Sequence, residues 1–376
     1  MTVEGNRIKI SFGIIVLNGE PFTRYCLRQL YPHAHEILVA EGAALSAKEF
    51  ATKNGHSVDG TLELLRKFKA TEDPEDKVRI ITSPEGFWAD RDAQSSAYAQ
   101  QATGDVLWQV DIDEFYLPEH IEAARNLFTD KTVTGAGVRW LNFWGWNNVV
   151  VDGWFLRSGG GDVNRIFRWG EGYGYGNHWV GPSAIRPDGS IVNHRAEGWV
   201  SAAELYRRKG ILCYHYSLVF PHQVLTKSKV YKDGTDPTYE HLDSDNWSVR
   251  GWLRLETPFF VHNRYDLPSW LEWAPECQPE HGIEMFSDIK RGNIHCEIRE
   301  MADARSLLAS NHYRAIRVVL RWLSAFRIKM GESHWRHYLD RWTVCWLRDG
   351  FSSASLRSVR FVFGKLVAKV SRAQRG

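Results

Sequence analysis

The first third of the chain alternates between short apolar runs and amphipathic stretches. Four apolar, β-branched runs are typical of buried strands: 8–17, 35–42, 77–82 and 105–113. Between these runs, apolar positions at helical spacing predict three helices: 21–30, 61–68 (with Asp59 as N-cap) and 89–102. Strands and helices that alternate in this way predict a parallel sheet with right-handed crossovers.

The pattern changes after residue 130. Residues 133–155 are rich in Gly and aromatic side chains and predict strands joined by turns, and 163–169 predict another strand. Shorter helices are expected further on: 200–208 and 221–232. We therefore expect three parts: an α/β domain over 1–232, an irregular extension over 233–300 and a basic, amphipathic helical region over 301–376.

The charge of the chain is unevenly distributed. The formal net charge of the 376 residues is +2, but residues 311–376 contain 14 Lys and Arg against 3 Asp and Glu. A basic amphipathic segment favours peripheral contact with an anionic membrane, and the alternative is a helix packed on the domain. We expect no nucleic acid partner, because no known binding module accompanies the basic residues.

Cysteine usage and the N-terminus indicate the compartment. The five cysteines are scattered and lack the spacing of a zinc site, so we expect free thiols in a reducing environment. The first residues are polar, and no run of about 18 apolar residues is long enough to cross a bilayer. These features predict a cytoplasmic protein, located at the inner face of the plasma membrane if the basic segment binds lipid.

Three carboxylates follow the fourth predicted strand, in the run Asp111-Ile112-Asp113-Glu114. Ligands of open parallel sheets bind at the carboxyl ends of strands. Crowded carboxylates repel one another unless a cation compensates, and Asp111 and Asp113 share one face of an extended chain. A divalent cation is one explanation. The alternative is a solvated turn before a helix N-terminus, where acidic residues are also favoured.

Several motifs together resemble glycosyltransferase family 2 of the GT-A enzymes, in its bacterial branch. The strand and loop at 13–20 (GIIVLNGE) resemble that branch's "MIVKNEE" segment, and 56–61 (HSVDGT) resemble its "GSTDGT" segment. Further matches follow in order: 36–42, 89–94, 102–105, the acidic run, 165–168, 175–178 and 214–217. The resemblance covers about 8–232 and is strongest over 8–117.

The resemblance implies a fold and an activity. The implied fold is GT-A, a Rossmann-like α/β fold with a mostly parallel sheet and helices on both faces, here with a helical C-terminal extension. Its donor half would be about 8–117 and its acceptor half about 130–232. The implied reaction moves a sugar from a nucleoside diphosphate sugar, with a UDP-sugar as first choice, to a hydroxyl of a glycan or lipid-linked acceptor. Inversion at the sugar is expected.

The resemblance also implies roles for individual residues. A divalent cation, Mn²⁺ or Mg²⁺, would be bound by Asp111, Asp113 and His215, although His215 could equally be a histidine packed between two tyrosines. The residues implied to bind the nucleotide sugar are Leu17, Asn18, Glu20, Glu41, Asp59, Arg91, Gln94 and Asp111. Glu41 would accept hydrogen bonds from the ribose, and Arg91 would reach the phosphates.

The catalytic base is open at this level. Many relatives have a Glu where this chain has Trp179. Glu114, Asp162 and Glu197 are possible bases, but we expect His178 or Glu171 to serve, because both lie in a Gly-rich, aromatic loop suited to an acceptor cleft. Five tryptophans are candidates for stacking on sugar rings, of which one or two are expected to do so: Trp140, Trp144, Trp146, Trp154 and Trp179.

Two other functions compete with the glycosyltransferase. A nucleotidyltransferase would need a Gly-rich loop with Arg and Lys after the first strand, which residues 17–20 lack. A non-catalytic carbohydrate-binding protein on the same scaffold would carry a degenerate acidic site, whereas Asp111 and Asp113 are both intact.

Overall fold

The computed structural model describes most of the first 223 residues and a helical segment beyond them. The described residues are 7–151, 162–170, 173–177, 181–184, 198–220, 222–223, 261–262, 268–269, 271–294 and 311.

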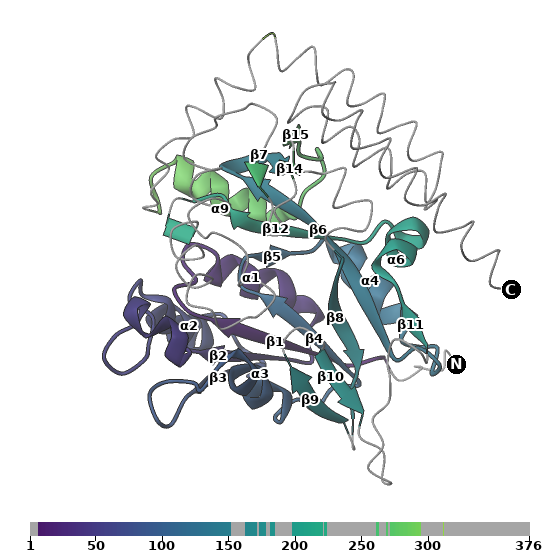
Figure 1. The fold of residues 1–376 in the computed structure, drawn as a ribbon, viewed down its shortest axis with the longest axis horizontal. Coiled ribbons are helices and arrows are strands. Elements are labelled where there is room, and N and C mark those ends of the chain that lie inside the picture. Colours follow the sequence, from purple (N-terminus) through teal and green to yellow (C-terminus); the bar gives the residue numbers. More distant parts are fainter. Residues whose placement is uncertain are drawn as a thin grey trace, which may run out of the picture.

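The donor half is built from alternating strands and helices (Figure 1). Its elements are β1 (Ile10–Val16), α1 (Thr23–Leu30), η1 (Tyr31–His33), β2 (Glu36–Glu41), η2 (Leu45–Phe50), α2 (Thr61–Thr71), β3 (Val78–Thr82), α3 (Arg91–Ala99) and β4 (Val106–Asp111). The four strands are parallel and lie in the order β3-β2-β1-β4. The predicted α/β fold class is confirmed, and the order of these four strands is that of a doubly wound sheet.

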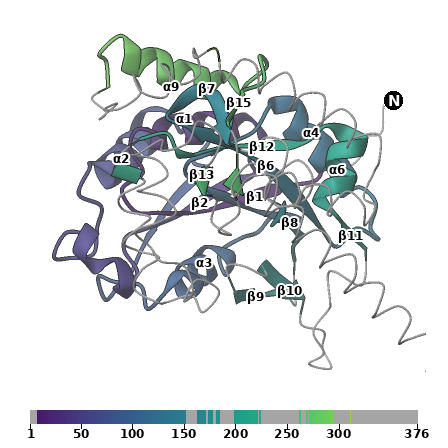
Figure 2. The same cartoon turned by 45° about the horizontal axis from the view of Figure 1, so that its top comes forward.

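Helices cover both faces of the sheet (Figure 2), and successive side chains of each strand point alternately toward the two faces. Residues Ile10, Phe12 and Ile14 of β1 join a core with α1, α2 and α4 (Pro118–Leu127). The opposite face packs against α3, where Tyr98 lies against Gly13. A Cβ at Gly13 would lie 2.2 Å from the Tyr98 ring, so only glycine lets α3 approach this closely.

The second half of the sheet is mixed. Its elements are β5 (Glu114–Phe115), β6 (Gly135–Trp144), β7 (Trp146–Val151), β8 (Asp162–Arg168), β11 (Trp199–Val200), α6 (Ala202–Lys209), β12 (Leu212–Leu218) and β15 (Leu271–Trp273). Strand β8 lies antiparallel between β4 and β6, while β12 runs parallel to β6 and antiparallel to β5. Two strand pairs lie apart from this sheet: β9 (Tyr173–Asn177) with β10 (Gly181–Ala184), and β13 (Val261–His262) with β14 (Pro268–Ser269).

Part of the expected irregular extension is helical. Helix α9 (Glu280–Lys290) packs on α1, where the Tyr25 hydroxyl donates to Asp288 at 2.7 Å. Phe286 of α9 joins the main core, so this segment shares the core of the α/β domain. Among the described residues, no helix has the length and apolar character needed to cross a membrane. The basic region 301–376 lies outside the described residues except for residue 311.

One predicted helix start is corrected. Gly60, with φ +90°, is the N-cap of α2, rather than Asp59. The Asp59 carboxylate accepts instead from the backbone N–H of Thr61 at 3.1 Å and from its hydroxyl at 2.6 Å. Asp59 therefore fixes the first turn of the helix from one residue further out.

Candidate active site

The carboxyl ends of three neighbouring strands meet at one edge of the sheet. In the strand register, Val16 of β1 lies beside Glu41 of β2, and Ile15 lies beside Asp111 of β4. Residues that follow these strands are therefore neighbours, although they are far apart in sequence. A Cβ at Gly19 would lie 3.2 Å from Ile112, which shows how closely the β1 loop approaches the acidic turn.

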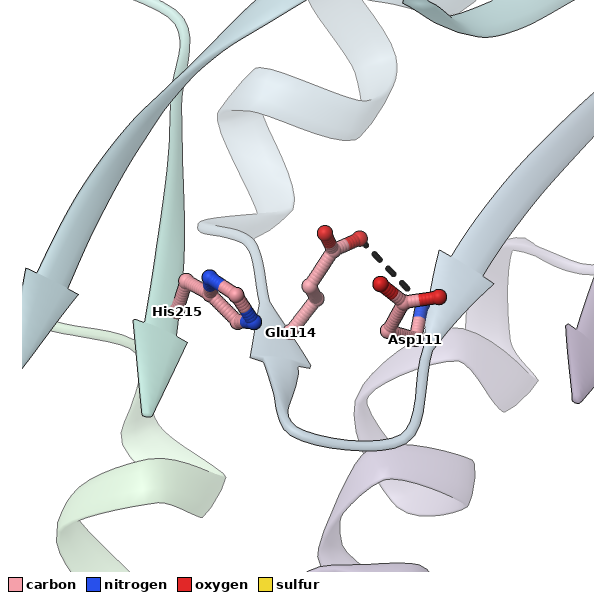
Figure 3. A group of neighbouring side chains, drawn as sticks. All are labelled: Asp111, Glu114 and His215. Carbon is pink, nitrogen blue, oxygen red and sulfur yellow. Dashed lines mark hydrogen bonds between the residues drawn. The ribbon is translucent and has the colours of Figure 1, made fainter. Parts of the chain in front are cut away.

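The acidic turn connects β4 to β5. Asp111 ends β4, and the chain turns through Ile112 and Asp113 to Glu114 at the start of β5. His215 of β12 lies beside Glu114 in the strand register and extends its ring toward the turn (Figure 3). Asp111, Glu114 and His215 each place one potential ligand atom within 4.8 Å of the others.

Glu114 is occupied by protein partners. Its side chain is fully buried and accepts from Trp140 Nε1 at 2.8 Å and from Arg165 Nη2 at 2.6 Å. The same Arg165 nitrogen lies 2.6 Å from Asp111 Oδ2. Burial lowers the pKa of Arg165, but the carboxylates of Asp111 and Glu114 raise it to well above its usual range. Arg165 is thus a permanent cation within the turn, and Glu114 has a structural role.

Asp113 has a different environment. Its Oδ1 lies 3.4 Å from His215 Nε2, and its Oδ2 lies 3.4 Å from Gln223 Nε2. The other ring nitrogen of His215, Nδ1, lies 2.7 Å from Asn142 Oδ1, an amide oxygen that can only accept a hydrogen bond. Nδ1 therefore carries a proton. In a neutral ring Nε2 then presents a lone pair to a carboxylate, an arrangement that a bound cation would stabilise.

The donor set at Asp113 suits a divalent cation. Carboxylate oxygens are ligands for Mg²⁺ and Mn²⁺, and an imidazole nitrogen favours a transition metal. The His215–Asn142 contact is the kind of outer hydrogen bond that fixes the tautomer of a ligating histidine. The backbone N–H of Tyr216 donates to the carbonyl of Asp113 at 2.9 Å, which fixes the turn to β12. The residues present therefore fit a metal at Asp113 and His215.

The loop after β1 is fixed by Asn18. This residue has φ +54°, and its backbone N–H donates to Ser57 Oγ at 3.0 Å. Its side chain donates to the carbonyl of Phe50 and accepts from the N–H of Val58, both at 2.8 Å. Asn18 thus joins the loop to the segment before α2. Leu17, also predicted to bind the nucleotide, packs against the small apolar cluster of Ala43 and Ala47.

Glu20 lies at the same edge, close to Asp59. The backbone N–H of Glu20 donates to Asp59 Oδ2 at 2.9 Å, so the two predicted nucleotide-binding residues are neighbours. Burial raises the pKa of Glu20 to about 7, and the negative charge of Asp59 acts in the same direction. Glu20 is therefore a carboxyl group that is partly protonated at neutral pH.

Glu41 has a positioning role in this structure. Its side chain is fully buried, and its two oxygens accept from the backbone N–H of Ser57 at 2.8 Å and lie 2.8 Å from His56 Nδ1. Both oxygens thus have protein partners and are buried, and the expected hydrogen bonds from ribose to Glu41 remain a prediction. His56 is the more exposed partner, with 31% of its side chain accessible.

Two candidates on α3 lie at the same edge. Gln94 is buried and donates to the carbonyls of Ala40 at 2.8 Å and Gly42 at 3.1 Å. The side-chain amide thus fixes α3 to the end of β2, and the predicted contact of Gln94 with the nucleotide sugar remains a prediction. Arg91, three residues earlier, is half-buried at the first turn of α3, and its predicted contact with phosphate remains a prediction.

The acceptor side is described only in part. Both candidate bases, His178 and Glu171, lie outside the described residues, as does Trp179. Trp140 is buried, donates to Glu114 and packs on His215 with ring centroids 4.6 Å apart. It therefore supports the acidic turn and is corrected as a candidate for stacking on a sugar.

Two residues of this edge, Arg165 and His56, were missed as site residues, and the protein partners of a third, Glu114, were not predicted. Arg165 lies in a predicted strand in which the residues two positions away, Val163 and Phe167, are apolar, and a charged residue on such a face is the signal that would have identified it. Glu114 was recognised as acidic, but its pairing with Arg165 joins residues 51 positions apart. His56 lies within the HSVDGT segment and carried no local signal of its link to Glu41.

Comparisons with known proteins give structural likenesses only. No protein-family model and no curated protein matches the chain. Among solved structures, TarS 1-349 from S. aureus in complex with UDP-GlcNAc is 15% identical, with a TM-score of 0.29, and the match covers 36% of this chain and 35% of that one. The chain thus spans about a third of that protein's length.

Two further structures extend the comparison. Mannosyltransferase PcManGT from Pyrobaculum calidifontis, in complex with GDP-Man and Mn²⁺, is 12% identical over 85% of this chain and 87% of its own, with a TM-score of 0.36. Glucosyl-3-phosphoglycerate synthase from Mycobacterium tuberculosis, in complex with Mn²⁺, UDP and phosphoglyceric acid, is 15% identical over 36% and 43%, with a TM-score of 0.22. All three are GT-A glycosyltransferases. With identities of 12–15% and TM-scores of 0.22–0.36, these likenesses assign no function to this chain.

Proposed function

We propose that the chain is a metal-dependent glycosyltransferase that moves a sugar from a nucleoside diphosphate sugar to a hydroxyl acceptor, with inversion. The observation that supports it most is the convergence of Asp113 and His215 at the carboxyl end of β4, in a β3-β2-β1-β4 sheet. This edge is where open α/β sheets bind nucleotides. The motif resemblance in the sequence points to the same edge.

The chemistry of the site agrees with this reaction. A departing nucleoside diphosphate accumulates negative charge, which a bound divalent cation would stabilise. Asp113 and His215 would hold that cation, and Asp111 would lie on its β4 side. Arg165 pairs with Asp111 and Glu114 and so fixes two of the three carboxylates of the turn. The mixed oxygen and nitrogen ligands favour Mn²⁺ over Mg²⁺.

The first test is a screen for stabilisation by ligands. The melting temperature is measured with UDP, GDP, CDP and dTDP, each with and without Mn²⁺ or Mg²⁺. We expect one nucleotide, with UDP as first choice, to raise the melting temperature only when metal is present, because binding to the folded state stabilises it. The rise should be lost in Asp113→Asn. If no nucleoside diphosphate stabilises the wild-type protein with either metal, the proposed donor site is wrong.

The acceptor half of the proposal concerns the base. An inverting transfer requires a group that takes the proton of the acceptor hydroxyl. We propose His178 or Glu171 for this role, and a glycan or lipid-linked intermediate as acceptor. Once a donor is known, His178→Gln and Glu171→Gln should be compared for kcat and for donor affinity. Substitution of the base should lower kcat by about 10²–10⁴-fold at unchanged donor affinity. If kcat in both variants equals that of the wild-type protein, neither residue is the base.

We further propose that the basic segment 311–376 contacts an anionic membrane at its cytoplasmic face. The excess of Lys and Arg among apolar residues in this segment supports the proposal. The full chain should sediment with vesicles that contain phosphatidylglycerol, and less so as salt is raised. Vesicles of phosphatidylcholine alone are the control. Equal sedimentation with both, or no change on deletion of 311–376, would contradict membrane binding.

A further inference from the structure

We propose that His56, held by the buried carboxylate of Glu41, contacts the nucleoside part of the donor. The inference rests on the proposed function and adds a binding residue to it. The family segment that 56–61 resembles has Gly at its first position, where this chain has His56. The imidazole is therefore a feature of this chain.

The pairing of Glu41 and His56 has a clear geometry. Glu41 is the last residue of β2, and its side chain is fully buried, whereas 31% of the His56 side chain is exposed. The Glu41 carboxylate lies 2.8 Å from His56 Nδ1 and accepts from the backbone N–H of Ser57 at 2.8 Å. A buried carboxylate thus fixes both the position of a half-exposed imidazole and the backbone that follows it.

This pairing leaves one ring nitrogen for a ligand. An ionised carboxylate only accepts hydrogen bonds, so Nδ1 of His56 carries the proton. Nε2 is then an acceptor in the neutral ring and a donor in the imidazolium ion. Hydroxyl groups and ring N–H groups of a nucleoside suit the first state, and carbonyl oxygens suit the second. Glu41 acts through His56 and is a positioning residue.

The position of His56 along the sheet edge suits a nucleoside. Strand β2 lies two strand spacings from β4, roughly 10 Å at the usual distance between neighbouring strands. If the diphosphate binds the cation at Asp113, the nucleoside extends away from the acidic turn, toward β1 and β2. His56 directly precedes Ser57 and Val58, which both bind Asn18 of the β1 loop.

An apolar cluster lies next to the same loop. Ala43 and Ala47 are buried, and four partly buried side chains pack against them: Leu17, Phe50, Ala51 and Phe87. The carbonyl of Phe50 accepts from the Asn18 side chain, so this cluster is joined to the β1 loop that adjoins His56. Ligand sites combine apolar walls with a few fixed polar groups, and this arrangement provides both.

The test uses His56→Asn. The Asn amide nitrogen takes the place of Nδ1 and retains the donor to Glu41, while the outward nitrogen is lost. Affinity is measured by calorimetry in the presence of Mn²⁺, for the nucleoside diphosphate that stabilises the wild-type protein and for inorganic pyrophosphate. We expect nucleotide affinity to fall by about tenfold, the effect of one hydrogen bond, with pyrophosphate affinity and the melting temperature unchanged.

The outcomes separate this inference from the proposed function. Equal nucleotide affinity in the wild-type protein and His56→Asn would overturn the role of His56 and leave the proposed function standing. A parallel loss of nucleotide and pyrophosphate would also overturn it, because the residue would then act on the phosphates or the fold. If the wild-type protein binds neither compound with metal, the proposed function fails. Glu41→Gln, which weakens the anchor of His56, should reduce nucleotide affinity selectively in the same way.

Discussion

Two adjacent carboxylates of the turn between β4 and β5, those of Asp113 and Glu114, lie in different environments. Glu114 is fully buried against a guanidinium nitrogen at 2.6 Å and an indole N–H at 2.8 Å. Asp113, one residue earlier, faces an imidazole and a carboxamide, each at 3.4 Å. Adjacent acidic residues therefore differ in environment: Glu114 is paired within the core, and Asp113 is the residue proposed to bind a ligand. The partners that other strands bring to each residue decide its environment.

The largest effect is expected at Glu114. Arg165→Met leaves the buried charge of Glu114 without its cation, and we expect a loss of about 3–5 kcal/mol in the free energy of unfolding. Urea denaturation measures this loss. The double variant Glu114→Gln/Arg165→Met removes both charges and should recover part of the loss. If Arg165→Met lowers the free energy of unfolding by less than about 1 kcal/mol, Arg165 does not stabilise the buried charge of Glu114.

Glu20 extends the comparison to a carboxyl group with a pKa raised by burial. Because its pKa is raised from 4.5 to about 7, the folded state binds the proton more tightly than the unfolded chain. Stability from this group is therefore present below pH 4.5 and is lost as the pH rises from 4.5 to 7, by about 3 kcal/mol at most. Glu20→Gln should flatten this part of the stability profile. A wild-type profile that rises over the same window, and is unaltered by the substitution, would contradict the raised pKa.

A smaller effect tests the indole that donates to Glu114. Trp140→Phe removes a hydrogen bond to a buried, charged acceptor, and we expect a loss of about 2 kcal/mol. Trp169→Phe is a matched control, because the indole of Trp169 donates to the neutral carbonyl of Ala102 at 3.0 Å. We expect about 1 kcal/mol there. Equal losses in the two variants would mean that the charge of Glu114 adds nothing to the bond with Trp140.

The sequence predicted the strands of the donor half well and individual partners poorly. The bounds of β1 to β4 agree with the predicted runs to within two residues, because apolar, β-branched runs are a local signal. The acidic turn was also predicted, because its carboxylates are adjacent in the sequence and directly follow one of these runs. The protein partners of Gln94 and Glu41 were not predicted, because their hydrogen bonds join residues 54 and 15 positions apart. Pairings of that kind depend on the packed fold and leave no local pattern.

Asp113 and His215 are proposed to bind a divalent cation that holds the donor diphosphate. The most direct measurement is a titration of Mn²⁺, followed by electron paramagnetic resonance, with saturating nucleoside diphosphate. Asp113→Asn is compared with Asp105→Asn, which alters a carboxylate at the opposite end of β4. We expect one Mn²⁺ per chain in the wild-type protein and in Asp105→Asn. In Asp113→Asn we expect Mn²⁺ to bind at least about a hundredfold more weakly, because removal of a residue that only hydrogen-bonds to a metal ligand already weakens binding by about 10–100-fold. Undiminished Mn²⁺ binding in Asp113→Asn would show that Asp113 does not bind the cation.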